Sequence, residues 1–308
     1  MAKLQKFIFS ACDAIVILAM AFALALPAGA AESASSSGKA LLEKYAVIKG
    51  KLEKNQYGLP IYLESEAKGD FLQGDVYGIV NYPCDTIGDS LQLPANWCSI
   101  STLHLNIKAC TFRNVDYQYQ LTLYSGRKYY EPPEDAHKLE FRFRVVAKTP
   151  EYLNVALTAD KGPFFTRDYR IGLEAVPLDT SRTFIHFSYS YRYGMFIRIL
   201  MNTYFATAGR DKIGFSIVAP GEKGNPVYVK GVRGALERNA VRYYLALLAY
   251  LDTLKFSTDQ RFDKRLNEWF ILTERYPRQL YEMDRKEYLA SKIKEHRNQD
   301  KLQKESEK

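Results

Sequence analysis

The segment Thr183-Phe-Ile-His-Phe-Ser-Tyr-Ser-Tyr-Arg-Tyr-Gly194 decides the fold. Large apolar side chains at every second position alternate with His186, Ser188 and Ser190, which is typical of a strand with one buried face. A helix is expected from Met195 to about Ala208. Its apolar side chains can be buried only against the ring-rich face of the sheet; they are Ile197, Leu200, Met201, Tyr204 and Phe205. We therefore predict a sheet that wraps around this helix.

The surrounding sequence supplies the rest of an antiparallel meander. Four more segments alternate in the same way and are separated by Gly, Pro and Asp; they are 117–123, 139–145, 153–157 and 169–173. Helices and two strands are expected before the meander, and helices after it; the ranges are 39–52, 61–65, 76–81, 85–97, 238–254, 261–275 and 279–295. We predict a polar, frayed tail over 297–308.

Two segments resemble a known family. Residues 75–97, Asp-Val-Tyr-Gly-Ile-Val-Asn-Tyr-Pro through Asn96-Trp97, resemble the opening strand, proline, helical pair and tryptophan of START and Bet v 1-like proteins, the SRPBCC superfamily. Residues 191–195 resemble its closing strand and the start of its long helix. The resemblance covers about 60–210, and the chain also resembles exported bacterial proteins of this type. It implies an α+β helix-grip domain over 39–222, to which 223–296 would add a helical extension.

The resemblance also implies a cavity between sheet and helix that holds an apolar small molecule or lipid. The rings of one sheet face and the helix supply candidate lining residues: Phe141, Phe143, Phe187, Tyr189, Tyr191, Met201 and Tyr204. The alternative is that these rings fill a core. By parity, His186 and Ser188 point away from the helix. The polar sheet face that carries Arg142, Arg144, Arg170 and Glu174 is either solvated or covered by the C-terminal helices.

The N-terminus predicts export. Residues 1–30 combine Lys3 and Lys6, an apolar run and Ala28-Gly29-Ala30, as in a cleaved signal peptide, although an uncleaved anchor is the alternative. A small-residue linker is expected over 31–38, and the periplasm is the expected location. An oxidising compartment allows a disulfide between Cys98 and Cys110, and we predict this bond with Cys84 as a free thiol. The alternative is that all three cysteines are reduced.

Composition and motifs bound the function. The 308 residues carry a formal net charge of +8, from 43 Lys+Arg and 35 Asp+Glu, without a dense basic run. This charge favours an anionic membrane surface over nucleic acid as a partner. No nucleotide, metalloprotease or serine-hydrolase motif occurs, and the spacing of Cys98, His104 and Cys110 fits no standard zinc site, so neither a cofactor nor a metal is expected. We predict an exported carrier; the alternatives are a cyclase- or hydrolase-type enzyme using the cavity and an envelope scaffold with a filled core.

Overall fold

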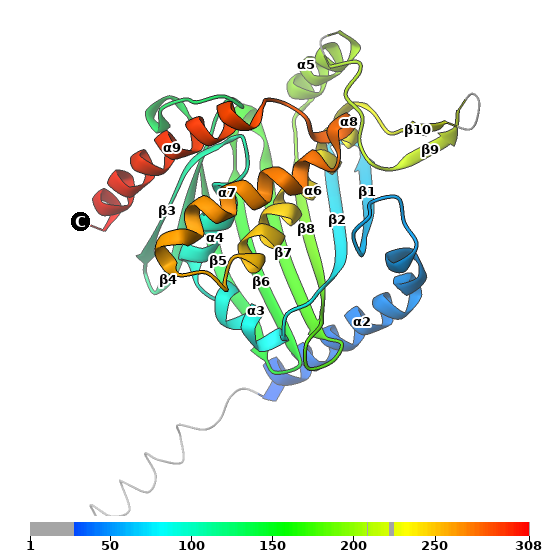
Figure 1. Cartoon of the computed structure of the whole chain (residues 1–308), viewed down its shortest axis with the longest axis vertical. Coiled ribbons are helices and arrows are strands. Elements are labelled where there is room, and N and C mark those ends of the chain that lie inside the picture. The colour runs from blue at the N-terminus through cyan, green and yellow to red at the C-terminus, as the bar shows by residue number, and fades with distance from the viewer. Residues whose placement is uncertain (1–27, 208, 222–224, 308) are drawn as a thin grey trace, which may run out of the picture.

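The computed structural model describes residues 28–207, 209–221 and 225–307. It is an α+β fold in which helices cover both faces of one large antiparallel sheet (Figure 1). The signal peptide expected over 1–30 lies almost wholly outside the described residues. None of the described helices is long and apolar enough to span a membrane.

The large sheet has eight strands in the order β1-β2-β8-β7-β6-β5-β4-β3. They are β1 (Ile61–Lys68), β2 (Phe71–Val80), β3 (Ile107–Val115), β4 (Gln118–Ser125), β5 (His137–Thr149), β6 (Tyr152–Lys161), β7 (Arg167–Pro177) and β8 (Thr183–Arg192). The helices are α2 (Ala28–Glu53), α3 (Cys84–Leu91), α4 (Pro94–Ser101), α5 (Met195–Ala206), α6 (Gly231–Asp252), α7 (Thr258–Glu274), α8 (Pro277–Leu280) and α9 (Arg285–Ser306). A separate hairpin pairs β9 (Ile217–Pro220) with β10 (Pro226–Tyr228). The curved sheet and the long helix against it confirm the predicted helix-grip architecture.

The helix that the sheet grips is α6, so the prediction of 195–208 as the gripped helix is wrong. α6 packs on β1, β2 and β8, and most of its residues are buried. Two glycines of β2 allow this close approach: a Cβ added at Gly78 would lie 1.9 Å from the Tyr244 hydroxyl oxygen, and one at Gly74 would lie 3.2 Å from the Cβ of Ala240. By contrast, α5 lies at one end of the sheet (Figure 1).

The C-terminal helices pack on the large sheet and supply the gripped helix, α6. The tail expected to fray over 297–308 continues α9 to Ser306. Gln299 and Gln303 on this helix accept hydrogen bonds from the backbone N–H groups of Cys110 and Phe112, each at 2.9 Å. These glutamines pair with edge strand β3, which would otherwise expose its backbone groups. The residues expected to form a linker over 31–38 belong to α2.

The parity predicted for β8 is confirmed, but a different helix lies on the outer face. Phe187 and Tyr189 face α6, with their ring centroids 6.3 and 5.8 Å from that of Tyr243. His186 lies on the opposite face and stacks on Tyr77 at 4.4 Å. α2 covers part of this face through an apolar cluster that includes Tyr45, Tyr77, Tyr152 and Phe184.

Of the two alternatives for the polar residues of the outer face, the solvated surface is the one that the structure shows, and the C-terminal helices do not cover these residues. Arg142, Arg144 and Arg170 are exposed, and Arg142 pairs with Asp160 at 2.6 Å. The exposed arginines need no buried partner because water solvates them.

The disulfide prediction is confirmed. Cys98 and Cys110 are bonded, with their Cα atoms 5.0 Å apart, and Cys84 is a buried free thiol. The bridge ties α4 to β3. It therefore fixes the segment 102–106, which contributes to the site described next.

Candidate functional site

A cavity of about 670 Å³ lies at one end of the sheet, between the sheet, α5 and α6. Its lining residues come from β3, β4, β5, β8, both helices and three loops: His104, Asn106, Ile107, Ser125, Gly126, Arg127, Glu131, Asp135, His137, Pro163, Phe164, Tyr189, Met201, Asn239 and Tyr243. The volume lies within the range of small-molecule sites, roughly 300–1,000 Å³. The lining mixes rings with polar groups, so it suits a ligand that has both apolar and polar parts.

His104 is the most deeply buried polar side chain of the lining, at 2% exposure. Its Nδ1 accepts a hydrogen bond from the backbone N–H of Asn106 at 3.1 Å. Burial, reinforced by nearby cations, lowers the pKa of His104 well below its usual value, so the ring is neutral. Because Nδ1 accepts, these hydrogen bonds assign the proton to Nε2. Nε2 is itself fully buried and makes no hydrogen bond of good geometry within the described residues, while the side chain of Asn239 lies close enough to act on the ring as a hydrogen-bond partner and oppose the lowering of its pKa.

Two buried lysines, Lys108 and Lys292, hold the backbone of the segment around His104 by hydrogen bonds. Lys292 Nζ donates to the carbonyl oxygens of His104 (2.8 Å) and Ile107 (2.9 Å). The carboxylate of Glu295 accepts from Lys108 and Lys292, each at 2.8 Å. One carboxylate thus serves two ammonium groups. Burial lowers the pKa of Lys292 to about 8, although Glu295 opposes this effect.

Arg242 adds a further buried cation beside the cavity. It lies on α6 next to the lining residue Tyr243, is 3% exposed, and donates through one terminal nitrogen to Glu282 (3.1 Å) and to the carbonyl of Leu280 (3.2 Å). Its Nε has no partner among the described residues. In that part of the chain, two buried side-chain donors therefore make no hydrogen bond of good geometry, His104 Nε2 and Arg242 Nε.

Aromatic rings form the apolar wall. The ring of Tyr243 stacks on His104 with centroids 4.6 Å apart and lies 5.8 Å from that of Tyr189. Burial raises the pKa of both tyrosines above the usual value, so both hydroxyls stay protonated at neutral pH. Met201 of α5 adds a flexible apolar side chain.

Charged groups mark the mouth. Arg127, Asp135 and His137 are exposed, and the half-buried Glu131 accepts a hydrogen bond from the backbone N–H of Arg127 at 2.8 Å. Phe164 is 60% exposed at a left-handed φ of 56°, which costs energy for an aromatic residue, and its ring meets that of His137 at 4.6 Å. The cavity thus has a buried end at His104 and an exposed end in these loops.

The predicted lining residues divide between the cavity and the core. Tyr189 and Met201 line the cavity. Tyr204 is 41% exposed on α5 and does not line it. The other four are buried in the core between sheet and α6, namely Phe141, Phe143, Phe187 and Tyr191. Phe187 and Tyr243 border a void of only about 10 Å³ there, so the centre of the grip is packed.

The polar end of the site is not predictable from the sequence. There His104 stands out only as a possible zinc ligand, and Asn239 and Tyr243 belong to no recognisable motif. His104 lies in a turn between α4 and β3, and the other two lie on α6, far away in sequence. No spacing pattern links these segments, since only the fold brings them together.

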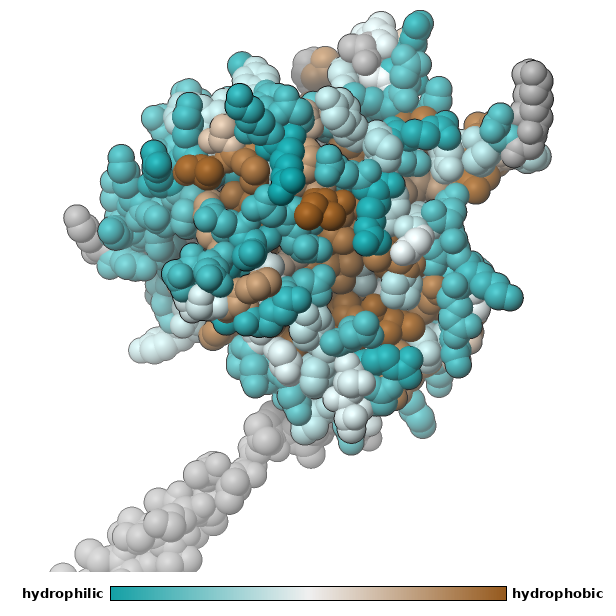
Figure 2. All heavy atoms as spheres, in the orientation of Figure 1, coloured by the Kyte–Doolittle hydropathy of each residue, from teal (hydrophilic) through white to brown (hydrophobic). Residues whose placement is uncertain are grey.

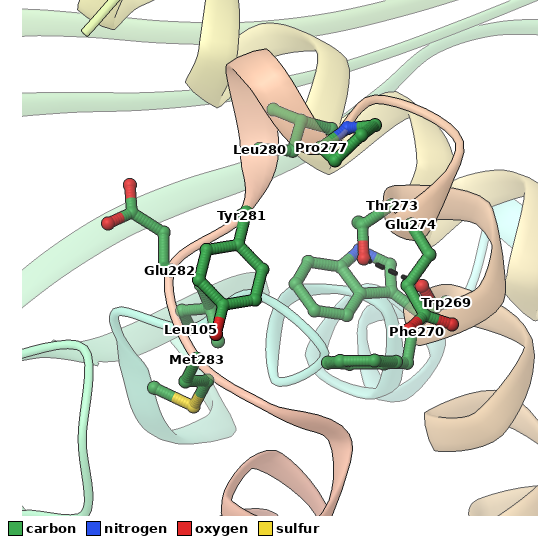
Figure 3. A pocket seen from close by; sticks show the side chains of 10 residues that line it. All are labelled: Leu105, Trp269, Phe270, Thr273, Glu274, Pro277, Leu280, Tyr281, Glu282 and Met283. Atoms are coloured by element: carbon green, nitrogen blue, oxygen red, sulfur yellow. Dashed lines mark hydrogen bonds between the residues drawn. The ribbon is translucent and has the colours of Figure 1, made fainter. Parts of the chain in front are cut away.

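A second cavity, of about 140 Å³, lies between α7, α8 and the segment that contains Leu105 (Figure 3). Figure 3 shows the rings of Trp269, Phe270 and Tyr281 around it, while the carboxylate of Glu282 points away from them. This volume is below that of most small-molecule sites. Two further hollows, of about 570 and 390 Å³, are lined mainly by exposed side chains, so the cavity beside His104 is the candidate site.

Comparison with protein-family models gives no match, and comparison with curated protein sequences gives none either. Among solved structures, this chain is similar to the Zhui aromatase/cyclase from Streptomyces sp. R1128 at 12% identity and a TM-score of 0.30, over 68% of this chain and 95% of that one. It is similar to norcoclaurine synthase from Thalictrum flavum at 14% identity and a TM-score of 0.31. This match covers 45% of this chain and 83% of that one. A conserved protein from Geobacillus kaustophilus is similar at 15% identity and a TM-score of 0.31. The match covers 45% of this chain and 86% of that one. Similarity at this level does not identify a function for this chain.

Proposed function

We propose that this protein binds a small organic molecule in the cavity between the sheet, α5 and α6. The observation that carries the proposal is a ligand-sized volume of about 670 Å³ whose lining combines aromatic rings with polar side chains. The rings of Tyr189 and Tyr243 would contact the apolar part of the ligand.

A native mass spectrum of the protein purified from the envelope of its producing cell tests this proposal. We expect one bound molecule per chain. Met201→Trp should abolish binding because the indole would occupy the cavity. Asn202→Trp is the matched control, since Asn202 is the exposed neighbour on the same helix. A spectrum without a bound molecule, or equal binding by both variants, would contradict the proposal.

Export and delivery of a lipid belong to the same proposal. The sequence of 1–30 supports export, and the Cys98–Cys110 bridge is compatible with an oxidising compartment. N-terminal sequencing of the product from the producing cell should begin at Ala31 or within a few residues of it. An intact Met1 would contradict export with cleavage.

We further propose that α5 rests on an anionic membrane surface beside the cavity. Met195, Ile199 and Leu200 are 72%, 61% and 55% exposed, and the helix carries one charge, on Arg198. An apolar face with a cation suits anionic headgroups. Ile199→Asp should reduce cosedimentation with phosphatidylglycerol vesicles by about tenfold. Asn202→Asp introduces the same charge at a polar position and should have a smaller effect; equal effects would point to charge alone.

Figure 2 shows apolar side chains on the β9–β10 hairpin, where Ile217, Val218 and Val227 are exposed. The hairpin follows α5 in the chain. Its apolar residues could extend the surface that α5 offers to a bilayer, and Val218→Asp provides a separate test of this extension in the same vesicle assay.

An enzyme that uses the same cavity is the second candidate. His104, Glu131, Asp135 and His137 all line it, which is more titratable groups than simple binding needs. None of the four hydrogen-bonds another within the described residues, so binding without catalysis is the better-supported function. Turnover of the co-purified molecule that Glu131→Gln abolishes, with the molecule still bound, would favour the enzyme.

A further inference from the structure

Two adjacent phenylalanines project into solvent at the exposed end of the cavity. Phe164 and Phe165 are 60% and 83% exposed in the short turn Pro163–Phe165 between β6 and β7. The start of β7 pairs with the end of β8, which leads into α5, so the turn lies at the same end of the sheet as α5. Phe164 also lines the cavity together with Met201 of α5. Two apolar elements, the turn and α5, therefore border the cavity.

The backbone of this turn is strained and yet well held. φ is 56° at Phe164 and 60° at Phe165, in the left-handed region that bulky side chains rarely adopt. The N–H of Gly162 donates to the carbonyl of Thr166 at 2.8 Å, and the N–H of Thr166 donates to that of Pro163 at 3.1 Å. Strained backbone that the surrounding structure holds in place occurs mainly at functional sites. Glycine or asparagine would adopt these angles more easily, so the two rings require a reason beyond the folding of the turn.

The charges beside these apolar side chains are positive. Lys161 precedes the turn and Arg198 lies on α5; both are exposed, and neither α5 nor the residues from Lys161 to Phe165 include a carboxylate. The carboxylates nearest in sequence to the turn, Asp160 and Asp168, lie 2.6 and 3.6 Å from an arginine nitrogen. Apolar side chains flanked by cations suit the boundary between anionic headgroups and acyl chains. Phenylalanine has no polar group that would need a hydrogen bond there.

We propose that Phe164 and Phe165 insert into an anionic lipid bilayer while α5 rests on the same surface, so that the open end of the cavity faces the membrane. This inference rests on the proposed function and names the source of the ligand, which would be an amphiphile dissolved in the bilayer. The apolar part of such a molecule would pass from the acyl chains to the rings of Tyr189 and Tyr243 without crossing water. Removal of the two phenylalanine rings from water favours the insertion.

Phe165→Trp reports insertion directly when the purified protein is mixed with vesicles of phosphatidylglycerol and phosphatidylcholine. The native tryptophans, Trp97 and Trp269, are 3% and 1% exposed and give a constant background. We expect the vesicles to shift the emission of this variant to shorter wavelength and brominated acyl chains to quench it. Tyr117→Trp is the matched control, because Tyr117 is also exposed at a left-handed φ, of 62°, but lies in the β3–β4 turn at the end of the sheet opposite α5. Its emission should not change.

Phe165→Asn measures how much the ring contributes to binding. Asparagine tolerates the left-handed region, so this variant should be at least as stable to heat as the wild type. Its partition onto the same vesicles in cosedimentation should fall by about tenfold, because one large apolar side chain no longer leaves water. Tyr117→Asn makes the matching change at the other end of the sheet and should keep the partition within about twofold.

Unchanged emission of Phe165→Trp in the presence of vesicles, or an equal loss of binding in Phe165→Asn and Tyr117→Asn, would overturn the insertion of the turn. Equal binding to vesicles of phosphatidylcholine alone would overturn the anionic surface as the partner. In either case a native mass spectrum with one bound molecule would leave the proposed function standing. A spectrum without a bound molecule would overturn the proposed function whatever the vesicles show.

Discussion

Replacing His186 should change how the stability of the protein depends on pH. Its Nε2 lies 2.9 Å from a carboxylate oxygen of Asp75, and its Nδ1 lies 2.9 Å from one of Glu174. Burial lowers the pKa of His186, but the hydrogen bonds and charges of the two carboxylates outweigh burial and raise it to about 9. His186→Gln removes the positive charge and keeps an amide that can donate to one carboxylate.

The magnitude follows from the two pKa values. An increase from 6.5 in the unfolded chain to about 9 in the folded protein corresponds to about 3 kcal/mol of stabilisation. Because the folded pKa is the higher one, the stabilisation is complete below pH 6.5, decreases between pH 6.5 and 9, and is absent above that range. The side chain is 16% exposed, so solvent screening reduces this value only modestly.

Urea unfolding of both proteins at pH 5.5, 7.5 and 9.5, followed by tryptophan fluorescence, measures the effect. The quantity to compare is the free energy of unfolding of the wild type minus that of His186→Gln. This difference should be about 3 kcal/mol larger at pH 5.5 than at pH 9.5. Burial lowers the pKa of Lys128 and of Lys292 to about 8, so these lysines make stability rise with pH. Both proteins share them, and the difference cancels their contribution. A difference that stays constant across this range would refute the argument.

Other substitutions test the packing and the disulfide. Gly78→Ala should destabilise the protein by about 1–3 kcal/mol in urea unfolding, because the added Cβ would overlap the buried Tyr244 hydroxyl. Gly74→Ala should cost less, since its Cβ would meet its nearest neighbour at 3.2 Å; an equal or larger cost would contradict the close approach of α6 at Gly78. Replacing Cys98 and Cys110 by serine should remove about 3 kcal/mol, as expected for a loop closed by residues 12 apart, and the free energy of unfolding of the variant should no longer respond to reductant.

The sequence predicted the strands of the meander well because most of them have one buried and one polar face. The alternation in β8 placed Phe187 and His186 on the correct faces. β3 was missed, since Ile107–Thr111 are all buried and show no alternation. Lys108 within that strand is fully buried against Glu295 on α9, a contact that no local pattern could predict.

The gripped helix was misplaced for a related reason. α5 directly follows β8 and is apolar, whereas α6 carries the charged residues Glu237, Arg238 and Arg242. In the structure, all three are buried. Glu237 accepts hydrogen bonds from the backbone N–H groups of Phe215 (2.6 Å) and Ser216 (2.8 Å), while Arg242 pairs with Glu282. Tertiary partners, absent from the local sequence, allow a charged helix to occupy the core.

The position of α6 also explains why the cavity is more polar than the rings of the sheet suggested. α6 is pressed against β1 and β2, where Gly74 and Gly78 leave no side chain in the way. The rings in the middle of the sheet therefore meet the helix directly, and only about 10 Å³ remains between them. Free volume persists at the ends of β3, β4 and β5, away from this contact. Loop residues and turns line that end, and their polar side chains give the site its hydrogen-bonding groups. A close helix contact at one edge of the sheet thus decides both where a ligand can bind and which chemistry would recognise it.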